Sequence, residues 1–342
     1  MNKQKISIST ASIVILLTLI LLIFFIGQII NVLLLLFASF VVASALFPFV
    51  DWLSKKMPRG LAVFLIFVIG VVVILTIFIP FVTIIISQTQ EFVRKVPTYW
   101  QALIDFLENM EILAGDSGFI PDYSQITSNI TKLGQEVVSK SIGFTLNLFS
   151  GLAAAFTLAV IVLFLLLDKE TLKRGCIKLF PPDYREQAEH ITETISKKVG
   201  GYVRGQLLLM LAVGLLTAIG LRLVGIEFAL LLGIVAGILE IVPIIGPIIA
   251  SVPGVLVGLA QDPILGLWAL LVYIIVQRIE NHFLTPLILG KFLEMHPLII
   301  IVAILIAAST LGVFGVILSP PLAAVIYVLV QELYLKKIEQ KA

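Results

Sequence analysis

A single acidic side chain stands in a long uncharged stretch of the C-terminal half of the chain. Glu240 is the sole acid between Phe228 and Ala260. A carboxylate near the centre of a bilayer costs about 2.5–3.5 kcal/mol on insertion scales, so a residue kept there is a candidate for binding a cation or a proton. The alternative is structural: Glu240 lies at a wet interface, or it pairs with Arg278.

Proline and glycine follow this acid at short spacing. The sequence PIIGP occupies 243–247, and proline within a helix removes a backbone hydrogen bond. Pro243, Gly246 and Pro247 are therefore expected to break the helix and to leave carbonyl groups that bind a cation or a polar solute. A simple hairpin turn is the alternative interpretation.

A second interrupted stretch lies nearer the C-terminus, where the uncharged run 295–331 contains two glycines and a pair of prolines. Between the two stretches is a polar segment whose side chains are candidates for lining a cytoplasmic entrance, with a solvated loop as the alternative. The predicted pathway for a solute or ion consists of Glu240, Pro243, Gly246, Pro247, Gln277, Glu280, Asn281, Pro286, Gly312, Gly315 and Pro320.

The composition of the chain places these residues in a membrane. Hydrophobic residues make up 60% of the 342 and charged residues only 13%, whereas about a quarter of the residues of a soluble protein are charged. A helix of about 20 apolar residues crosses the hydrocarbon core, and several uncharged runs reach that length. We therefore predict an all-α integral membrane protein with about eight membrane segments.

The N-terminal part, 1–87, is predicted to hold three transmembrane helices. Its uncharged run, Ile6–Val50, is too long for one span. Gly27, Gln28 and Asn31 form a polar break near its middle, so we expect two spans joined by a very short turn, followed by a third.

The remaining 255 residues are predicted to alternate between membrane and water. Their parts are an extracytoplasmic helical segment at 88–147, a transmembrane helix at 148–167, a cytoplasmic amphipathic linker at 168–202 that bends at Gly200 and Gly201, a transport core at 203–335 and a cytoplasmic tail at 336–342. Each half of the core is expected to hold a span and a broken, re-entrant helical hairpin. Paired interrupted segments of this kind indicate an inverted-repeat transporter.

Basic residues near the span ends predict the orientation. When the spans are counted, the basic groups before the first span, after the second, after the fourth and at the C-terminus all fall on one side, which is expected to face the cytoplasm. Both termini are then cytoplasmic. The segment 88–147 falls outside, and it carries seven acidic against four basic residues, which agrees with that placement.

Five segments of the core resemble the autoinducer-2 exporter family of bacterial membrane proteins. They are GYVRGQLLL at 201–209, FALLLGIVAGILEIVPIIGP at 228–247, IENHFLTPLILG at 279–290, HPLIIIVAILI at 296–306 and GVFGVILSPPLAA at 312–324. The resemblance implies an eight-span transporter in the bacterial cytoplasmic (inner) membrane. It also implies export of the quorum signal or Na⁺/H⁺ exchange, and homo-oligomers.

Other classes of function find little support in the sequence. The net charge of +2 is too small to indicate nucleic acid as a partner, and Cys176 is the only cysteine. The three histidines lack ligand spacing, so we expect no metal and no cofactor. HExxH, GxSxG and P-loop motifs are absent, so the chain is not expected to be an enzyme.

Three functions remain open. The first is a secondary transporter or exporter of a small polar solute, which has the bilayer and that solute as its partners. The second is a monovalent cation/proton antiporter that uses Glu240 as the exchanged site. The third is a membrane accessory protein that transports nothing.

Overall fold

Helices form every regular element that the computed structural model describes. The described residues are 10–73, 154–243, 245–290, 292 and 295–335, with single positions between 76 and 98. Among these described residues, four helices are long and apolar enough to cross a membrane: Ile29–Leu53, Pro182–Leu223, Pro263–Leu289 and Phe314–Tyr334. The all-helical prediction is confirmed for these residues, whereas the number of eight segments stays a prediction.

Helix α1 runs without interruption over Thr10–Leu53. The expected turn near Gly27, Gln28 and Asn31 is therefore wrong. The physical reason is that glycine and asparagine cost at most about 1 kcal/mol in a helix interior, far less than proline. The C-terminal half of α1 packs with helices Arg59–Val73 and Ala154–Leu167 around a shared apolar cluster that consists of Ala43, Val50, Val63, Val162 and Leu166.

Helix α4 (Lys169–Lys178) and the short η1 (Pro182–Tyr184) lead into α5, which spans Arg185–Leu223. The predicted bend at Gly200 and Gly201 is wrong, because α5 continues through both. These glycines permit close packing instead. A Cβ at position 200 would lie 2.1 Å from the carbonyl oxygen of Ser44, and one at 201 would lie 2.1 Å from the ring of Phe292.

The helical structure is interrupted after Leu239, close to the proline and glycine residues that predicted a break. Helix α6 (Ala229–Leu239) ends before Glu240, and α7 (Ile245–Gln261) begins five residues later. Asp262 caps the next helix, α8 (Pro263–Ile279), by accepting a 2.7 Å hydrogen bond from the backbone N–H of Ile264. Helices α6 and α7 pack against each other, and α7 packs against α8.

Helix α8 continues through a π-helical turn, η2 (Glu280–Leu284), into α9 (Thr285–Leu289). The last helix, α10 (Pro297–Val330), changes direction at Gly312, where φ is 60° and ψ is −145°, and η3 (Gln331–Leu335) follows it. Pro320 and Pro321 lie inside the second arm and do not interrupt it. The expected break is therefore confined to Gly312.

The two arms of α10 fold back on each other. Ile300 and Ala303 of the first arm share an apolar cluster with Ala323, Ala324 and Tyr327 of the second. The re-entrant course of this pair in a membrane, and that of α6 and α7, stays a prediction.

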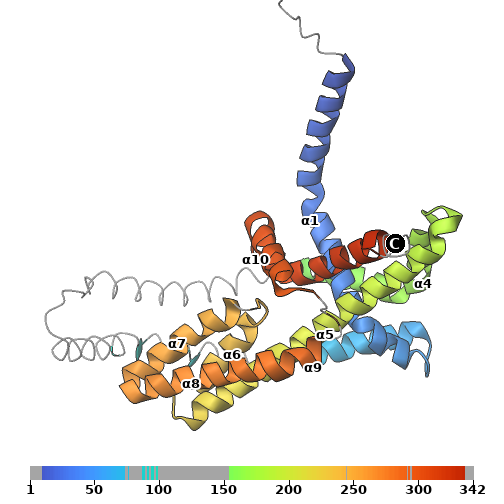
Figure 1. The fold of residues 1–342 in the computed structure, drawn as a ribbon. Coiled ribbons are helices and arrows are strands. Elements are labelled where there is room, and N and C mark those ends of the chain that lie inside the picture. Colours follow the sequence, from blue (N-terminus) through green and yellow to red (C-terminus); the bar gives the residue numbers. More distant parts are fainter. Residues whose placement is uncertain are drawn as a thin grey trace, which may run out of the picture.

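Helix α5 is the element on which the others assemble. It contacts α1, α4, α6, α8, α9 and α10. Figure 1 shows it running diagonally across the molecule, with α6 and α8 beside its C-terminal half and α4 at its other end. The predicted extracytoplasmic segment 88–147 and the tail 336–342 lie outside the described residues, apart from single positions up to 98.

Candidate functional site

Two buried carboxyl groups meet beside the break between α6 and α7. Glu240 follows the last residue of α6 and is 1% exposed, and Glu280 opens the π-helical turn η2 and is 6% exposed. They lie close enough for each carboxyl group to act electrostatically on the other. The structure thus places Glu280 against Glu240, where a pairing with Arg278 was the alternative.

The two acids differ in their surroundings. One carboxylate oxygen of Glu280 accepts a 2.5 Å hydrogen bond from Gln277 Nε2, and the other accepts one of 3.5 Å from Thr285 Oγ1. Oε2 of Glu240 is buried and has no hydrogen-bond partner among the described residues. A buried polar atom normally has a partner, and a proton shared with Glu280 or a bound cation would provide one.

The sequence interpretation missed Gln206 of α5. Its Nε2 donates a 2.7 Å hydrogen bond to the backbone carbonyl of Glu240, and its side chain is 5% exposed. The carbonyl groups at the end of a helix have no hydrogen-bond donor within that helix. Gln206 supplies a donor to the carbonyl of Glu240, which directly follows α6. The available signal was a single polar residue in the otherwise apolar stretch that follows Arg204.

The turn after Glu240 is tight, and backbone hydrogen bonds between its own residues stabilise it. The backbone N–H of Ile245 donates to the carbonyl of Pro243 at 2.8 Å, and that of Gly246 donates to the carbonyl of Val242 at 2.9 Å. A Cβ at position 246 would lie 1.9 Å from the carbonyl oxygen of Leu239. The predicted glycine therefore lets the beginning of α7 lie against the end of α6.

A small cavity adjoins the acid pair. Its volume is about 170 Å³, and its lining comes from α5, α6, α7 and α8. Pro247 and Gln277 line it, so Gln277 borders the cavity and also donates to Glu280. Tyr273 and Thr217 also line it, and neither hydroxyl has a hydrogen-bond partner in the part of the chain that is described. Sequence reasoning had singled out neither residue.

The other predicted residues lie apart from this cluster. Asn281 and Pro286 are exposed on η2 and α9. Gly312, Gly315 and Pro320 belong to α10, where Gly315 packs against the carbonyl of Ala307. Their part in a pathway stays a prediction. The structure brings together Glu240, Gln277 and Glu280, with Pro247 on the wall of the adjoining cavity.

No group of three or more His, Cys, Asp or Glu side chains suited to a metal ion occurs among the described residues. The site therefore consists of two carboxyl groups, two amides and three hydroxyl groups. Such a set can exchange a proton, coordinate a monovalent cation or hydrogen-bond a polar solute.

Comparison with known proteins agrees with a transport role. The sequence profile of the AI-2E family transporter matches residues 12–335. One relative, named "Putative transport protein YueF" in Bacillus subtilis, is 31% identical over 290 residues, which cover 82% of this chain and 78% of the relative. Another, named "Putative permease PerM" in Escherichia coli K12, is 28% identical over 302 residues, or 85% of each chain. The chain therefore belongs to the AI-2E family of membrane transporters.

Proposed function

We propose that the protein is a secondary transporter that exports a small polar solute across the bacterial inner membrane. Membership of a transporter family supports this function, and relatives that bear the names of a transport protein and a permease support it as well. An autoinducer-2-like signal is the solute that the family name suggests. Both termini face the cytoplasm in this proposal, as the distribution of lysine and arginine predicts.

The observation that carries the proposal is the pair formed by Glu240 and Glu280. Two ionised carboxylates in one water-poor site repel each other. A bound proton or monovalent cation removes that repulsion, and its departure restores it. The energy of the pair thus depends on ion occupancy, which is the property that ion-coupled transport requires.

The position of the pair links ion occupancy to the helix break. Glu240 directly follows α6 and Glu280 directly follows α8, so a change in their repulsion acts on both helix ends. Gln277 extends the link to the small cavity, because it donates to Glu280 and lines the cavity wall. An ion at the carboxyl groups and a solute in the cavity would share this amide.

A monovalent cation/proton antiporter is the second candidate, and two observations favour it. Glu240 is the only acid in the interrupted segment of the sequence, but in the folded chain a second buried acid, Glu280, lies beside it. The cavity of about 170 Å³ is also smaller than ligand pockets, which usually measure about 300–1,000 Å³. A cavity of this size holds an ion with a few waters more readily than a sugar-like signal.

The test is Glu240→Gln, which keeps the shape of the side chain and removes its charge. Purified variants in proteoliposomes are assayed for flux of the polar solute and of Na⁺ and protons, and their thermal stability is measured in parallel. We expect lost or uncoupled flux with unchanged or increased stability, because the substitution relieves repulsion with Glu280. Glu280→Gln should behave in the same way.

Glu186→Gln on the exposed start of α5 is the matched control and should retain full flux. Unchanged flux and unchanged ion dependence in both site variants would remove the acid pair from the mechanism. Solute flux without any cation or proton movement in the wild-type protein would exclude the antiporter.

A further inference from the structure

A second and larger cavity lies away from the acid pair. Its volume is about 720 Å³, and its walls come from the C-terminal half of α1, helix Ala154–Leu167, α4 and α5, with Phe292 closing one side. This volume falls within the range of about 300–1,000 Å³ that ligand sites occupy. The transport site described above does not use it.

The wall contributed by α1 changes from apolar to charged along the helix. Phe40, Ser44, Phe47, Pro48 and Asp51 line the cavity, and their spacing places them on one face of the helix. Next to the charged end, Phe49 and Trp52 are exposed, and Lys56 lies over the Trp52 ring at 5.0 Å from its centroid. Tryptophan is enriched at membrane–water boundaries, so the charged end of the cavity is expected to lie near such a boundary.

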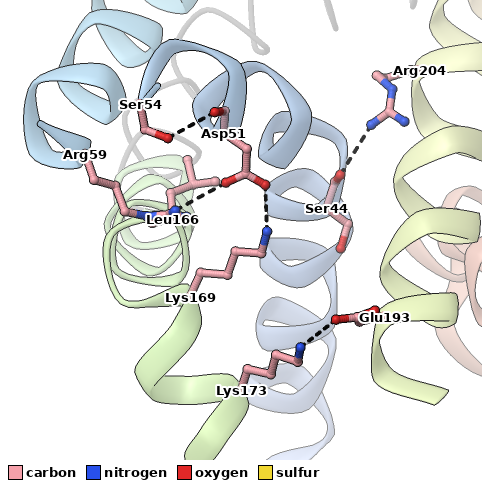
Figure 2. Close-up of polar contacts among 9 residues, drawn as sticks. All are labelled: Ser44, Asp51, Ser54, Arg59, Leu166, Lys169, Lys173, Glu193 and Arg204. Carbon is pink, nitrogen blue, oxygen red and sulfur yellow. Dashed lines mark hydrogen bonds and ion pairs between the residues drawn. The ribbon is translucent and has the colours of Figure 1, made fainter. Parts of the chain in front are cut away.

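Several charges in the lining neutralise one another. Lys169 lies 2.7 Å from a carboxylate oxygen of Asp51, and Lys173 lies 2.6 Å from one of Glu193, as Figure 2 shows. Hydrogen bonds to Glu189 and Glu193 raise the pKa of Lys173, so this lysine remains charged and paired. These pairs leave little attraction for a further anion.

Two other cations in the lining form no ion pair within 4 Å among the described residues, although Glu193 acts on the first of them electrostatically. They are Lys197 and Arg204, which lie seven residues apart and hence on the same face of α5. Nη1 of Arg204 donates to the backbone carbonyls of Ser44 at 3.4 Å and Ala45 at 3.0 Å. A guanidinium group has five N–H donors, so Arg204 retains donors for an anion.

Ser44 gives an independent indication of a ligand. Its side chain is 2% exposed, it lines the cavity, and its hydroxyl has no hydrogen-bond partner in the described part of the structure. Figure 2 shows the guanidinium group of Arg204 on α5 directed at the backbone carbonyl of Ser44 on α1. A hydroxyl group without a hydrogen-bond partner and two cations outside the ion pairs described above thus line one cavity.

We propose that this cavity binds an anionic phospholipid of the surrounding bilayer. Its phosphate lies against Lys197, Arg204 and the Ser44 hydroxyl, and an acyl chain follows the apolar wall at Phe40 and Phe47. Basic pockets between membrane helices commonly bind anionic headgroups. The apolar wall selects a lipid over a soluble phosphate, because a free anion would leave it exposed to water. This inference is independent of the proposed transport function.

Cys176 provides a reporter for the test, since it is the only cysteine, is exposed and lines the cavity. The full-length protein in a neutral detergent is labelled with N-ethylmaleimide while short-chain phosphatidylglycerol is titrated. We expect the labelling rate to fall severalfold and to saturate. Short-chain phosphatidylcholine and inorganic phosphate at the same concentrations should leave the rate unchanged.

Matched variants identify the groups responsible. Lys197→Gln and Arg204→Gln should abolish protection, and Glu170→Gln, which removes an exposed acid from the lining, should strengthen it. Lys178→Gln at the end of α4 lies outside the lining and should protect as the wild type does. Lys197 is exposed, so its substitution tests binding even if Arg204→Gln fails to fold.

Three results would overturn the proposal. They are equal protection by phosphatidylcholine, protection by inorganic phosphate alone, and protection that persists in Lys197→Gln.

Discussion

Gln206 on α5 donates a 2.7 Å hydrogen bond to the backbone carbonyl of Glu240, and this bond connects α5 to the end of α6. An unsatisfied buried acceptor costs about 1–3 kcal/mol. Gln206→Met keeps the length of the side chain and removes the donor, so we expect it to lower the free energy of unfolding by that amount. Thermal unfolding in detergent measures the change. Leu207→Met, at the exposed neighbouring position, is the control, and equal stability of the two variants would contradict the assigned bond.

The turn between α6 and α7 should not tolerate a Cβ at position 246. In Gly246→Ala the new methyl group would meet the carbonyl oxygen of Leu239 at 1.9 Å. Overpacking of this kind costs about 1–3 kcal/mol or more, so we predict reduced thermal stability and impaired flux. Gly70→Ala has no atom within 4 Å of the new Cβ and should be neutral, or stabilising by up to about 1 kcal/mol. A fully stable and active Gly246→Ala protein would show that the turn differs from the one described.

Gly312 should be the residue that allows the two arms of α10 to fold together. Its φ of 60° and ψ of −145° belong to a region that residues other than glycine rarely occupy, and alanine there should cost about 1–3 kcal/mol. Spin labels at Val302 and Ile326, both exposed, report the geometry in a Cys176→Ser background.

A straight helix would separate these two positions by about 36 Å, given a rise of 1.5 Å per residue. We expect a clearly shorter distance in the parent protein, and a longer or broader distribution in Gly312→Ala. A distance near that of a straight helix in the parent would exclude the folded arrangement of α10.

The predicted orientation can be tested with the native cysteine. Cys176 is exposed on α4, which the distribution of basic residues assigns to the cytoplasm. A membrane-impermeant maleimide should therefore label it in inverted vesicles but not in intact cells. Ser117→Cys in a Cys176→Ser background should give the opposite result, because 88–147 is predicted to lie outside. Labelling of Cys176 in intact cells would reverse the topology.

The sequence predicted two of the helix breaks correctly but not those expected near Gly27 and at Pro320. The interruption after Leu239 and the kink at Gly312 both follow from residues at those positions. The same reasoning erred at Gly200 and Gly201, where glycine permits contact with Ser44 and Phe292 rather than a bend. The sequence alone does not show which other helix packs against a glycine. A glycine that permits close packing therefore cannot be distinguished in the sequence from one that permits a bend.

The acid pair could be predicted only in part for the same reason. Glu240 was identifiable from the cost of placing a carboxylate in an apolar stretch. Glu280 looked like one of several polar residues in a loop, and its burial beside Glu240 depends on the packing of α8 and η2. The roles of Gln206 and Tyr273 depend on contacts made in the folded chain, namely the bond to Glu240 and the wall of the small cavity.

The unbroken course of α5 has a mechanical consequence. Arg204 lines the large cavity, and Gln206 donates a hydrogen bond to the carbonyl of Glu240. The two residues are only two positions apart in one continuous helix. Two residues correspond to about 200° of rotation around a helix, so the two side chains point in nearly opposite directions. Any twist of α5 about its own axis moves both at once. A ligand bound at Arg204 and the position of the carboxyl pair would therefore be coupled through the rotation of α5.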